Sequence, residues 1–273
     1  QFPFNIFWGV SFHICAHLFV LFFQILQLIY APVQYQLRHQ VHSAVLRTVY
    51  FGLVICLFTT VFSFLIAILL NEKFVGKVLL RVMIVLPWAV PSVVSGVLWG
   101  QMFHADTGFL NALLYQSGII SEYKIWLADP LIALHIIAVA EIWKAIPFMT
   151  LFFLSGLQSL PSESFEAASV DGANVFQRFF YILFPLMLPI AIPLFLIQFV
   201  LAMKSFDTIF VLTRGGPGGG TTTLNYFIYK EAFETFNLGR ASAAAYILLI
   251  ITLAVVLIPS ISKKILKFFW GNK

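Results

Sequence analysis

Residues 166–185 read EAASVDGANVFQRFFYILFP, and this stretch lies between two long apolar segments. It contains too many polar residues to cross a bilayer, because a spanning helix needs about 20 predominantly apolar residues. It is also punctuated by Gly172, Asn174 and Pro185, which is typical of short helices joined by a turn. We therefore interpret it as a folded helical hairpin on the inner face of a membrane protein, where it can dock a soluble partner.

Composition places the rest of the chain in the membrane. Of the 273 residues, 61% are hydrophobic and only 10% are charged, whereas a soluble domain carries about 25% charged residues. The alternation of apolar and polar residues that marks a membrane barrel is absent, so the predicted fold class is an all-α membrane protein. The net charge of +5 comes from dispersed basic residues and does not indicate nucleic-acid binding.

Six apolar stretches are long enough to cross a bilayer. They are Phe4–Tyr30, Ala44–Leu70, Leu79–Phe103, Leu131–Leu157, Leu186–Leu212 and Ala241–Ile261. Six spans place both termini on the same side of the membrane. Basic residues in the connections slightly favour a cytoplasmic location for that side, so we expect both termini in the cytoplasm.

The hairpin carries its own start and stop signals. A first short helix is expected over Glu163–Val170, with Ser162 able to cap it. Gly172 is placed to leave this helix in a left-handed turn. Asn174 can cap a second short helix, which Pro185 is expected to end.

The spacing within this hairpin resembles the EAA signature of the membrane subunits of bacterial ABC importers, written EAA-x3-G-x9-I-x-L-P. The residues in register are Glu166, Ala167, Ala168, Gly172, Ile182 and Pro185. The single departure is Phe184, where the family has Leu, and it preserves an apolar side chain.

In that family the segment is the coupling helix, which sits in a cleft of a cytoplasmic ATPase subunit. The resemblance implies that the ATPase-facing residues here are Glu166, Ala167, Ala168, Asp171 and Gly172. Glu166 would pair with a basic residue of the ATPase, and Gly172 would permit the bend. Small alanines allow the close approach that a helix in a groove requires.

Other landmarks extend the resemblance over about residues 43–267, and the Leu-Thr-x-Gly-Gly-Pro segment at 212–217 is similar to the MalF-like member of the carbohydrate-uptake permeases. The implied organisation is a first span with its outer connection at 1–42, a permease core at 43–267 with its EAA loop at 158–185, and a cytoplasmic tail at 268–273.

The implied partners are a second, MalG-like permease, an ATPase dimer, an extracytoplasmic solute-binding protein and membrane lipid. The implied cargo is a sugar, oligosaccharide or related solute, including an acidic one. ATP and magnesium would be bound by the ATPase subunits, so no cofactor is expected in this non-catalytic chain. The implied location is the bacterial inner membrane.

Charged residues inside the predicted spans are expected to have a function or a partner, because isolated charges are costly there. Glu141 and Lys144 lie three residues apart, as do Lys204 and Asp207, and each pair is predicted to share one helix face. Such pairs either neutralise each other locally or line an interior cavity.

Resemblance to the maltose importer of this family implies seven residues along the solute path: Lys144, Ala145, Phe148, Gln198, Leu201, Ala202 and Ser205. Phe148 can stack on a sugar ring, and Lys144 can meet a carboxylate or phosphate on the solute. The resemblance also places an outer loop, Gly215, Gly216 and Pro217, near the docked binding protein, with glycines for a tight turn.

Two alternatives stay open from the residues themselves. A polytopic intramembrane enzyme would use His135, Glu141 and Asp207, although no known catalytic spacing links them. A stand-alone secondary transporter is disfavoured by the lack of an internal repeat. His13 and His17 lack the further ligands that a metal site needs, so no metal is predicted.

Overall fold

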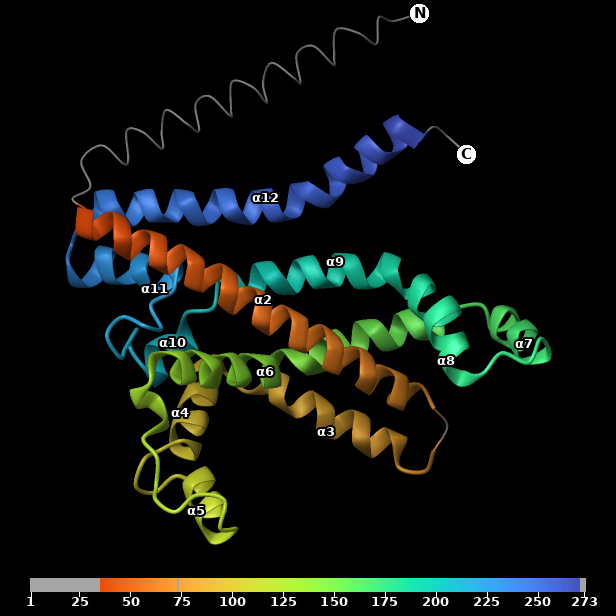
Figure 1. The fold of residues 1–273 in the computed structure, drawn as a ribbon, viewed down its shortest axis with the longest axis horizontal. Coiled ribbons are helices and arrows are strands. Elements are labelled where there is room, and N and C mark those ends of the chain that lie inside the picture. The colour runs from red at the N-terminus through yellow and green to blue at the C-terminus, as the bar shows by residue number, and fades with distance from the viewer. Residues whose placement is uncertain (1–34, 73, 271–273) are drawn as a thin grey trace, which may run out of the picture. The chain divides into compact units, whose positions relative to one another are not determined.

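The computed structural model describes residues 35–72 and 74–270, and these ranges contain helices and no strand. The elements in chain order are α2 (Tyr35–Asn71), α3 (Lys77–Ala89), α4 (Ser92–Met102), α5 (Phe109–Gln116), η1 (Trp126–Ala128), α6 (Pro130–Gln158), α7 (Ser162–Val170), α8 (Val175–Arg178), η2 (Phe179–Leu183), α9 (Phe184–Met203), α10 (Asp207–Leu212), α11 (Leu224–Tyr229), η3 (Lys230–Glu234) and α12 (Leu238–Trp270). The predicted all-α class is confirmed (Figure 1).

The chain divides into two units, residues 1–44 and 45–273, and helices α3 to α12 belong to the second unit. The predicted first span, Phe4–Tyr30, lies outside the described residues, as do His13 and His17.

Within residues 35–72 and 74–270, four helical runs are long and apolar enough to span a membrane: residues 39–71, 130–158, 175–212 and 238–257. They correspond to the predicted second, fourth, fifth and sixth spans. The predicted third span, Leu79–Phe103, contains Pro87 and Pro91, and here α3 and α4 meet at an angle of 98°. Pro91 explains the break, since the residue before a proline is pushed to extended backbone and Val90 has φ −75° and ψ 125°.

The predicted fifth span, Leu186–Leu212, is interrupted as well. Helix α9 ends at Met203 and α10 begins at Asp207. The Asn225 side-chain amide donates to the Lys204 carbonyl at 2.7 Å, which satisfies an acceptor that the helix leaves unpaired. Lys204 and Asp207 therefore flank a break, and the prediction that they share one helix face is wrong.

Helix α6 lies at the centre of this unit and packs against α3, α4, α9 and α10. One core cluster joins it to α2 and the α10–α11 region through Phe51, Ile55, Leu134, Ile137, Ala202, Ile209 and Tyr226. A second cluster joins it to α2 and α9 through Ala67, Leu70, Met149, Phe153, Met187 and Leu194. Movement of α6 is therefore coupled by packing to most of the bundle.

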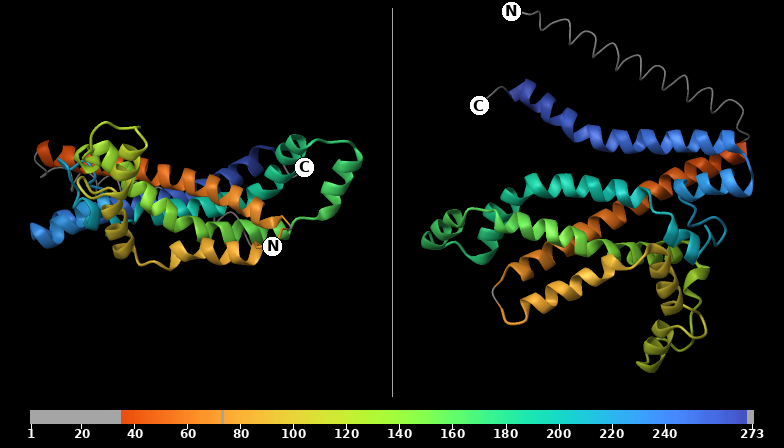
Figure 2. Two further views of the ribbon diagram at one scale, coloured as in Figure 1. Left: turned by 90° about the horizontal axis from the view of Figure 1, so that it is seen from below. Right: turned by 180° about the vertical axis from the view of Figure 1, so that it is seen from behind.

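Figures 1 and 2 show how the connections divide between the two ends of the bundle. Helix α7 and the α2–α3 turn lie at one end. The connection between α10 and α11 and the start of α6 lie at the other end, near α4 and α5. The hairpin of α7 and α8 is thus separated by the length of the spanning helices from the glycine-rich loop, which is the connection between α10 and α11.

Replacement of Phe153 by alanine should destabilise the protein strongly, because this side chain is fully buried and packs edge-on against Phe64 at 5.4 Å between ring centroids. We expect a loss of about 3–5 kcal/mol in the free energy of unfolding. Denaturation of the purified protein in detergent measures it. Phe152→Ala is the matched control, since Phe152 is 47% exposed; equal losses for the two variants would contradict the core assignment.

Candidate functional site

The hairpin at one end of the bundle is held by local backbone bonds. The Asp171 amide donates to the Ala167 carbonyl at 2.9 Å, and the Ala173 amide donates to the Ala168 carbonyl at 2.9 Å. Gly172 stands between them with φ +76°, in the left-handed region that the sequence predicted. This is the common glycine-terminated end of a helix, in which the last carbonyls are satisfied by the turn itself.

The second helix of the hairpin starts with a reciprocal cap. The Gln177 amide donates to the Asn174 side chain at 2.9 Å, and the Asn174 amide donates to the Gln177 side chain at 2.8 Å. The Arg178 guanidinium then donates to the Ser169 hydroxyl at 3.0 Å, which ties α8 back to α7. The angle between the two short helices is therefore fixed by their own residues.

Two details of the predicted hairpin are wrong. Pro161 occupies the capping position and Ser162 is the first residue of α7, with no side-chain cap. Pro185 does not end the second helix, because α8 continues through the π turn η2 into α9. Pro185 lies in the first turn of α9, a position where a missing N–H costs little.

Four of the five predicted contact residues are exposed on the hairpin: Glu166, Ala167, Asp171 and Gly172. Ala168 is buried. Sequence reasoning missed three apolar neighbours of the turn, Val170, Val175 and Phe176, which are 87%, 69% and 76% exposed. Their position on either side of the Gly172 turn was the available signal. An exposed apolar cluster among polar residues is typical of a protein interaction site.

A second candidate site lies within the bundle, where α6 carries two residues of opposite charge. The Thr208 hydroxyl of α10 donates to the Glu141 carboxylate, and the Lys144 ammonium donates to the Ser92 hydroxyl of α4. Glu141 and Lys144 do not form an ion pair with each other, since the described residues contain a single ion pair, between Arg240 and Glu231. The interpretation as a local ion pair is therefore not supported.

The two helices held in this way also pack against each other. A Cβ atom at Gly96 would lie 3.0 Å from the Val211 Cβ, and one at Gly100 would lie 3.3 Å from a Leu212 methyl carbon. Helices α4 and α10 thus approach closely through the glycines of α4. The Glu141 and Lys144 side chains anchor this pair of short helices to α6.

The seven residues predicted for the solute path occupy different environments. Lys144 and Phe148 face the α3–α4 bend, where Phe148 stacks on Trp88 at 6.2 Å between ring centroids. Ala145 is half-buried on the same helix.

On α9, Gln198 and Ala202 are buried, whereas Leu201 is 51% exposed. The Ser205 hydroxyl is buried without a hydrogen-bond partner among the described residues. The structure therefore brings Lys144 and Phe148 together, but it does not gather all seven side chains in one place.

The glycine-rich loop between α10 and α11 forms a tight turn. Gly215 is buried with φ +77°. The Thr221 hydroxyl donates to the Gly216 carbonyl at 2.8 Å, and the Thr222 hydroxyl donates to the Gly215 carbonyl at 3.1 Å. The loop is thus ordered by its own threonines.

The residues proposed for an intramembrane enzyme are not assembled. The Tyr50 hydroxyl bonds to Nε2 of His135 at 2.8 Å, and Nδ1 of His135 bonds to the Leu131 carbonyl at 2.7 Å. Glu141 accepts from Thr208, and Asp207 is exposed at the start of α10. His135 and Glu141 therefore have structural partners rather than each other.

Broken helices inside a membrane bundle, together with an exposed helical hairpin at one end, define a transport permease better than an enzyme. Residues 59–268 match the family described as binding-protein-dependent transport system inner membrane component. Because this match covers more than half of the sequence, the chain belongs to that family.

Two relatives are 39% and 36% identical to the chain over the aligned residues. The trehalose/maltose transport system permease protein MalF of Thermococcus litoralis is 39% identical over 192 residues, which are 70% of this chain and 63% of that protein. The sn-glycerol-3-phosphate transport system permease protein UgpA of Agrobacterium fabrum is 36% identical over 213 residues, covering 76% of this chain and 70% of that protein. The match thus spans slightly less than two thirds of the Thermococcus relative.

The fold is also that of a solved transporter. A crystal structure of a bacterial ABC transporter involved in the import of the acidic polysaccharide alginate matches with a TM-score of 0.74 at 21% identity, over 96% of this chain and 95% of that chain. A complex of a bacterial alginate transporter with its pentasaccharide-bound periplasmic protein gives a TM-score of 0.72 at 20% identity, over 93% of this chain and 91% of that chain. At this identity the likeness establishes the fold.

Replacement of Gly215 by alanine should cost more stability than the same change at Gly218. Both residues have positive φ, so both variants incur strain of about 1 kcal/mol or more. Only at Gly215 would the new Cβ also clash, lying 2.6 Å from the Tyr226 ring and 2.7 Å from the Thr222 hydroxyl. Thermal denaturation of the two variants measures the difference, and a larger loss for Gly218→Ala would contradict the described loop.

Proposed function

We propose that this chain is the membrane-spanning subunit of an ATP-driven, binding-protein-dependent importer for a carbohydrate or a related solute. The observation that carries the proposal is the exposed hairpin with EAA spacing, on which the apolar cluster Val170, Val175 and Phe176 is mostly exposed. The cluster and Glu166 would dock in a cleft of a cytoplasmic ATPase. A second permease would complete the translocation path.

The orientation follows from this docking. The α7 end of the bundle would face the cytoplasm, and the end with the glycine-rich loop would face the solute-binding protein. Both termini would also be cytoplasmic, which the distribution of basic residues in the sequence favours. ATP and magnesium would be held by the ATPase subunits, so this chain would contribute no catalytic residue and bind no cofactor of its own.

The connections of α7 show how motion of the ATPases would reach the bundle. The hairpin is joined directly to the end of α6 and, through α8 and η2, to the start of α9. A displacement of the hairpin would therefore pull on both helices. Glu141 and Lys144 of α6 hold α10 and α4 through hydrogen bonds. The same displacement would therefore also move these two short helices.

The solute class follows from the α3–α4 bend. Phe148 and Trp88 offer aromatic faces on which a sugar ring can stack. Lys144 is bonded to a neutral hydroxyl instead of a carboxylate, so its charge is available to an acidic group of the solute. Relatives with this architecture are named for trehalose/maltose, for sn-glycerol-3-phosphate and for alginate, of which the last two are anionic.

Replacement of Phe176 by serine, or of Glu166 by alanine, should uncouple the transporter. We expect roughly tenfold weaker association of the ATPase subunits, since buried interface anchors contribute about 1–2 kcal/mol or more. Co-purification of the ATPase and ATP hydrolysis stimulated by the binding protein measure the effect. Gly172→Pro should act in the same direction, because proline cannot adopt φ +76°.

Phe236→Ser is the matched control for this experiment, because Phe236 is 80% exposed but lies beyond η3, before α12, at the opposite end of the bundle. It should leave ATPase association unchanged. Normal coupling in the Phe176, Glu166 and Gly172 variants would reject the hairpin as the docking element.

Replacement of Lys144 by methionine should discriminate between solutes. Import of an acidic sugar should fall by about tenfold relative to a neutral one, since one lost charged hydrogen bond is about 1.5–3 kcal/mol. Uptake of labelled solutes into proteoliposomes measures the ratio. Lys144→Arg, which preserves the charge, should restore part of the preference. An unchanged ratio in Lys144→Met would remove Lys144 from solute recognition.

A further inference from the structure

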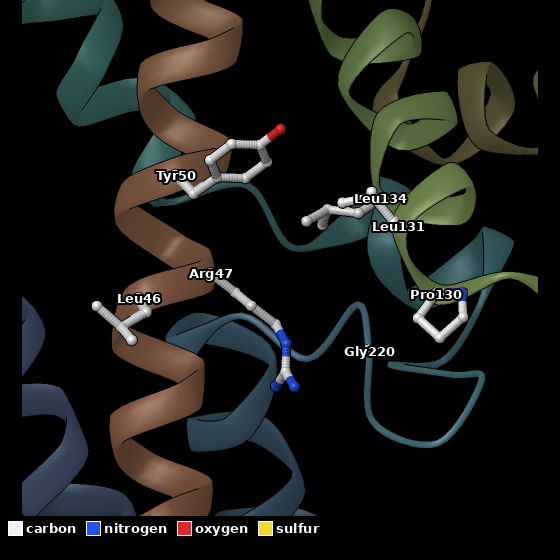
Figure 3. Close-up of a pocket in the computed structure, with 7 residues that line it drawn as sticks. All are labelled: Leu46, Arg47, Tyr50, Pro130, Leu131, Leu134 and Gly220. Carbon is white, nitrogen blue, oxygen red and sulfur yellow. The ribbon is translucent and has the colours of Figure 1, made fainter.

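A pocket of about 370 Å³ lies beside the start of α6, at the end of the bundle opposite α7 in Figure 1. Figure 3 shows the residues that line it. Its lining comes from three elements: Leu46, Arg47 and Tyr50 of α2, Pro130, Leu131 and Leu134 of α6, and Gly220 of the glycine-rich loop. None of these residues belongs to the hairpin or takes part in the hydrogen bonds by which Glu141 and Lys144 join α6 to α10 and α4.

The pocket is lined by one cationic side chain, Arg47, and by an apolar wall of leucine and proline side chains. The Arg47 side chain extends from α2 toward the loop that carries Gly220 (Figure 3). It is half-buried, and it forms no hydrogen bond or ion pair with any residue that the structure describes. A guanidinium beside leucine and proline side chains is only partly hydrated, so an anion that reaches it gains a strong, charge-assisted interaction.

The position along the spanning helices sets the depth of the pocket. Pro130 is the first residue of α6, and Leu134 lies about one turn further along. Arg47 lies eight residues after the start of the α2 spanning run at His39. The Arg47 pocket is therefore near the end of the apolar part of the bundle, where a long arginine side chain can reach the level of the lipid headgroups. Tyr50 agrees with this depth, because its ring lies against the pocket while its hydroxyl bonds to His135, as is usual for tyrosine at a membrane interface.

The exposed face of α2 continues from the pocket toward the centre of the membrane. Leu46, Tyr50, Leu53 and Leu57 are 56%, 44%, 46% and 54% exposed and follow each other at intervals of four, three and four residues. This spacing places them on one face of the helix. Thr48 faces the interior instead, where its hydroxyl accepts from the Leu224 amide at 2.7 Å. The apolar stripe is long enough to lie along a lipid acyl chain.

We propose that the Arg47 pocket binds the phosphate of an anionic phospholipid, whose acyl chain lies along the Leu46–Leu57 stripe. The guanidinium offers paired N–H donors to two phosphate oxygens, and the pocket wall of Leu131 and Leu134 receives the glycerol and the first methylene groups. The bound lipid would bridge α2, the start of α6 and the glycine-rich loop. This site is independent of the solute that the protein carries.

The test uses the full chain in the assembly with which it purifies, reconstituted in nanodiscs of phosphatidylcholine with or without phosphatidylglycerol. Native mass spectrometry then measures the fraction of complexes that retain phosphatidylglycerol. We expect Arg47→Gln to lower the affinity for that lipid by about fivefold, which is the usual effect of one basic contact at an anionic membrane surface. Arg47→Lys should retain much of the binding, which also separates lost charge from misfolding.

Lys124→Gln is the matched control. Lys124 is an exposed basic residue that lies over Trp126, just before α6, and it does not line the Arg47 pocket. Its replacement should leave lipid retention unchanged.

Three results would overturn the proposal. Equal phosphatidylglycerol retention in wild type and Arg47→Gln would remove Arg47 from lipid binding. Displacement of the lipid by inorganic phosphate alone would show a site for free anions, with no role for the acyl chain. Weaker docking of a partner protein in Arg47→Gln, to the same extent in both kinds of nanodisc, would show that the arginine serves a protein carboxylate.

Discussion

The arrangement of the bundle depends on how α6 accommodates two charged side chains within the membrane. A carboxylate or ammonium in an apolar environment must find a polar partner, because its desolvation is costly. Glu141 and Lys144 find theirs in the hydroxyls of Thr208 and Ser92, on two different short helices. Since α4 and α10 also pack tightly through Gly96, the three helices form one connected layer.

That layer explains why the broken helices are tolerated. The 98° bend between α3 and α4 and the interruption after Met203 both expose backbone groups that lipid cannot satisfy. The side-chain amide of Asn225 satisfies one of them, and Ser95 and Gly96 of α4 are buried where that helix meets α10. In many transporters, helices broken in this way border the solute site. Here the proposed solute contacts Lys144 and Phe148 face the bend between α3 and α4.

Much of the candidate coupling site could be predicted from sequence, because its interactions are local. The left-handed turn at Gly172 and the cap at Asn174 both follow from residues within a few positions of each other. The effect of Pro185 was mispredicted because a π turn, Phe179–Leu183, joins α8 to α9 without a break. A π turn inserts an extra residue per turn, and no simple spacing rule anticipates it. The exposure of Phe176 was missed, because the residue type alone does not distinguish an apolar side chain at a docking surface from one that faces lipid or the core of a membrane protein.

The sequence by itself determined the helical class, the approximate extent of the spans, the hairpin and the family to which the chain belongs. These features depend on apolar length, local capping and residue spacing, all of which are read along the chain. Only the tertiary structure decided the angle between α3 and α4, the separate partners of Glu141 and Lys144, and the pocket around Arg47. The physical reason is distance along the chain: the partners of Glu141 and Lys144 are 67 and 52 residues away, so packing of the whole bundle, and not local preference, brings them into contact.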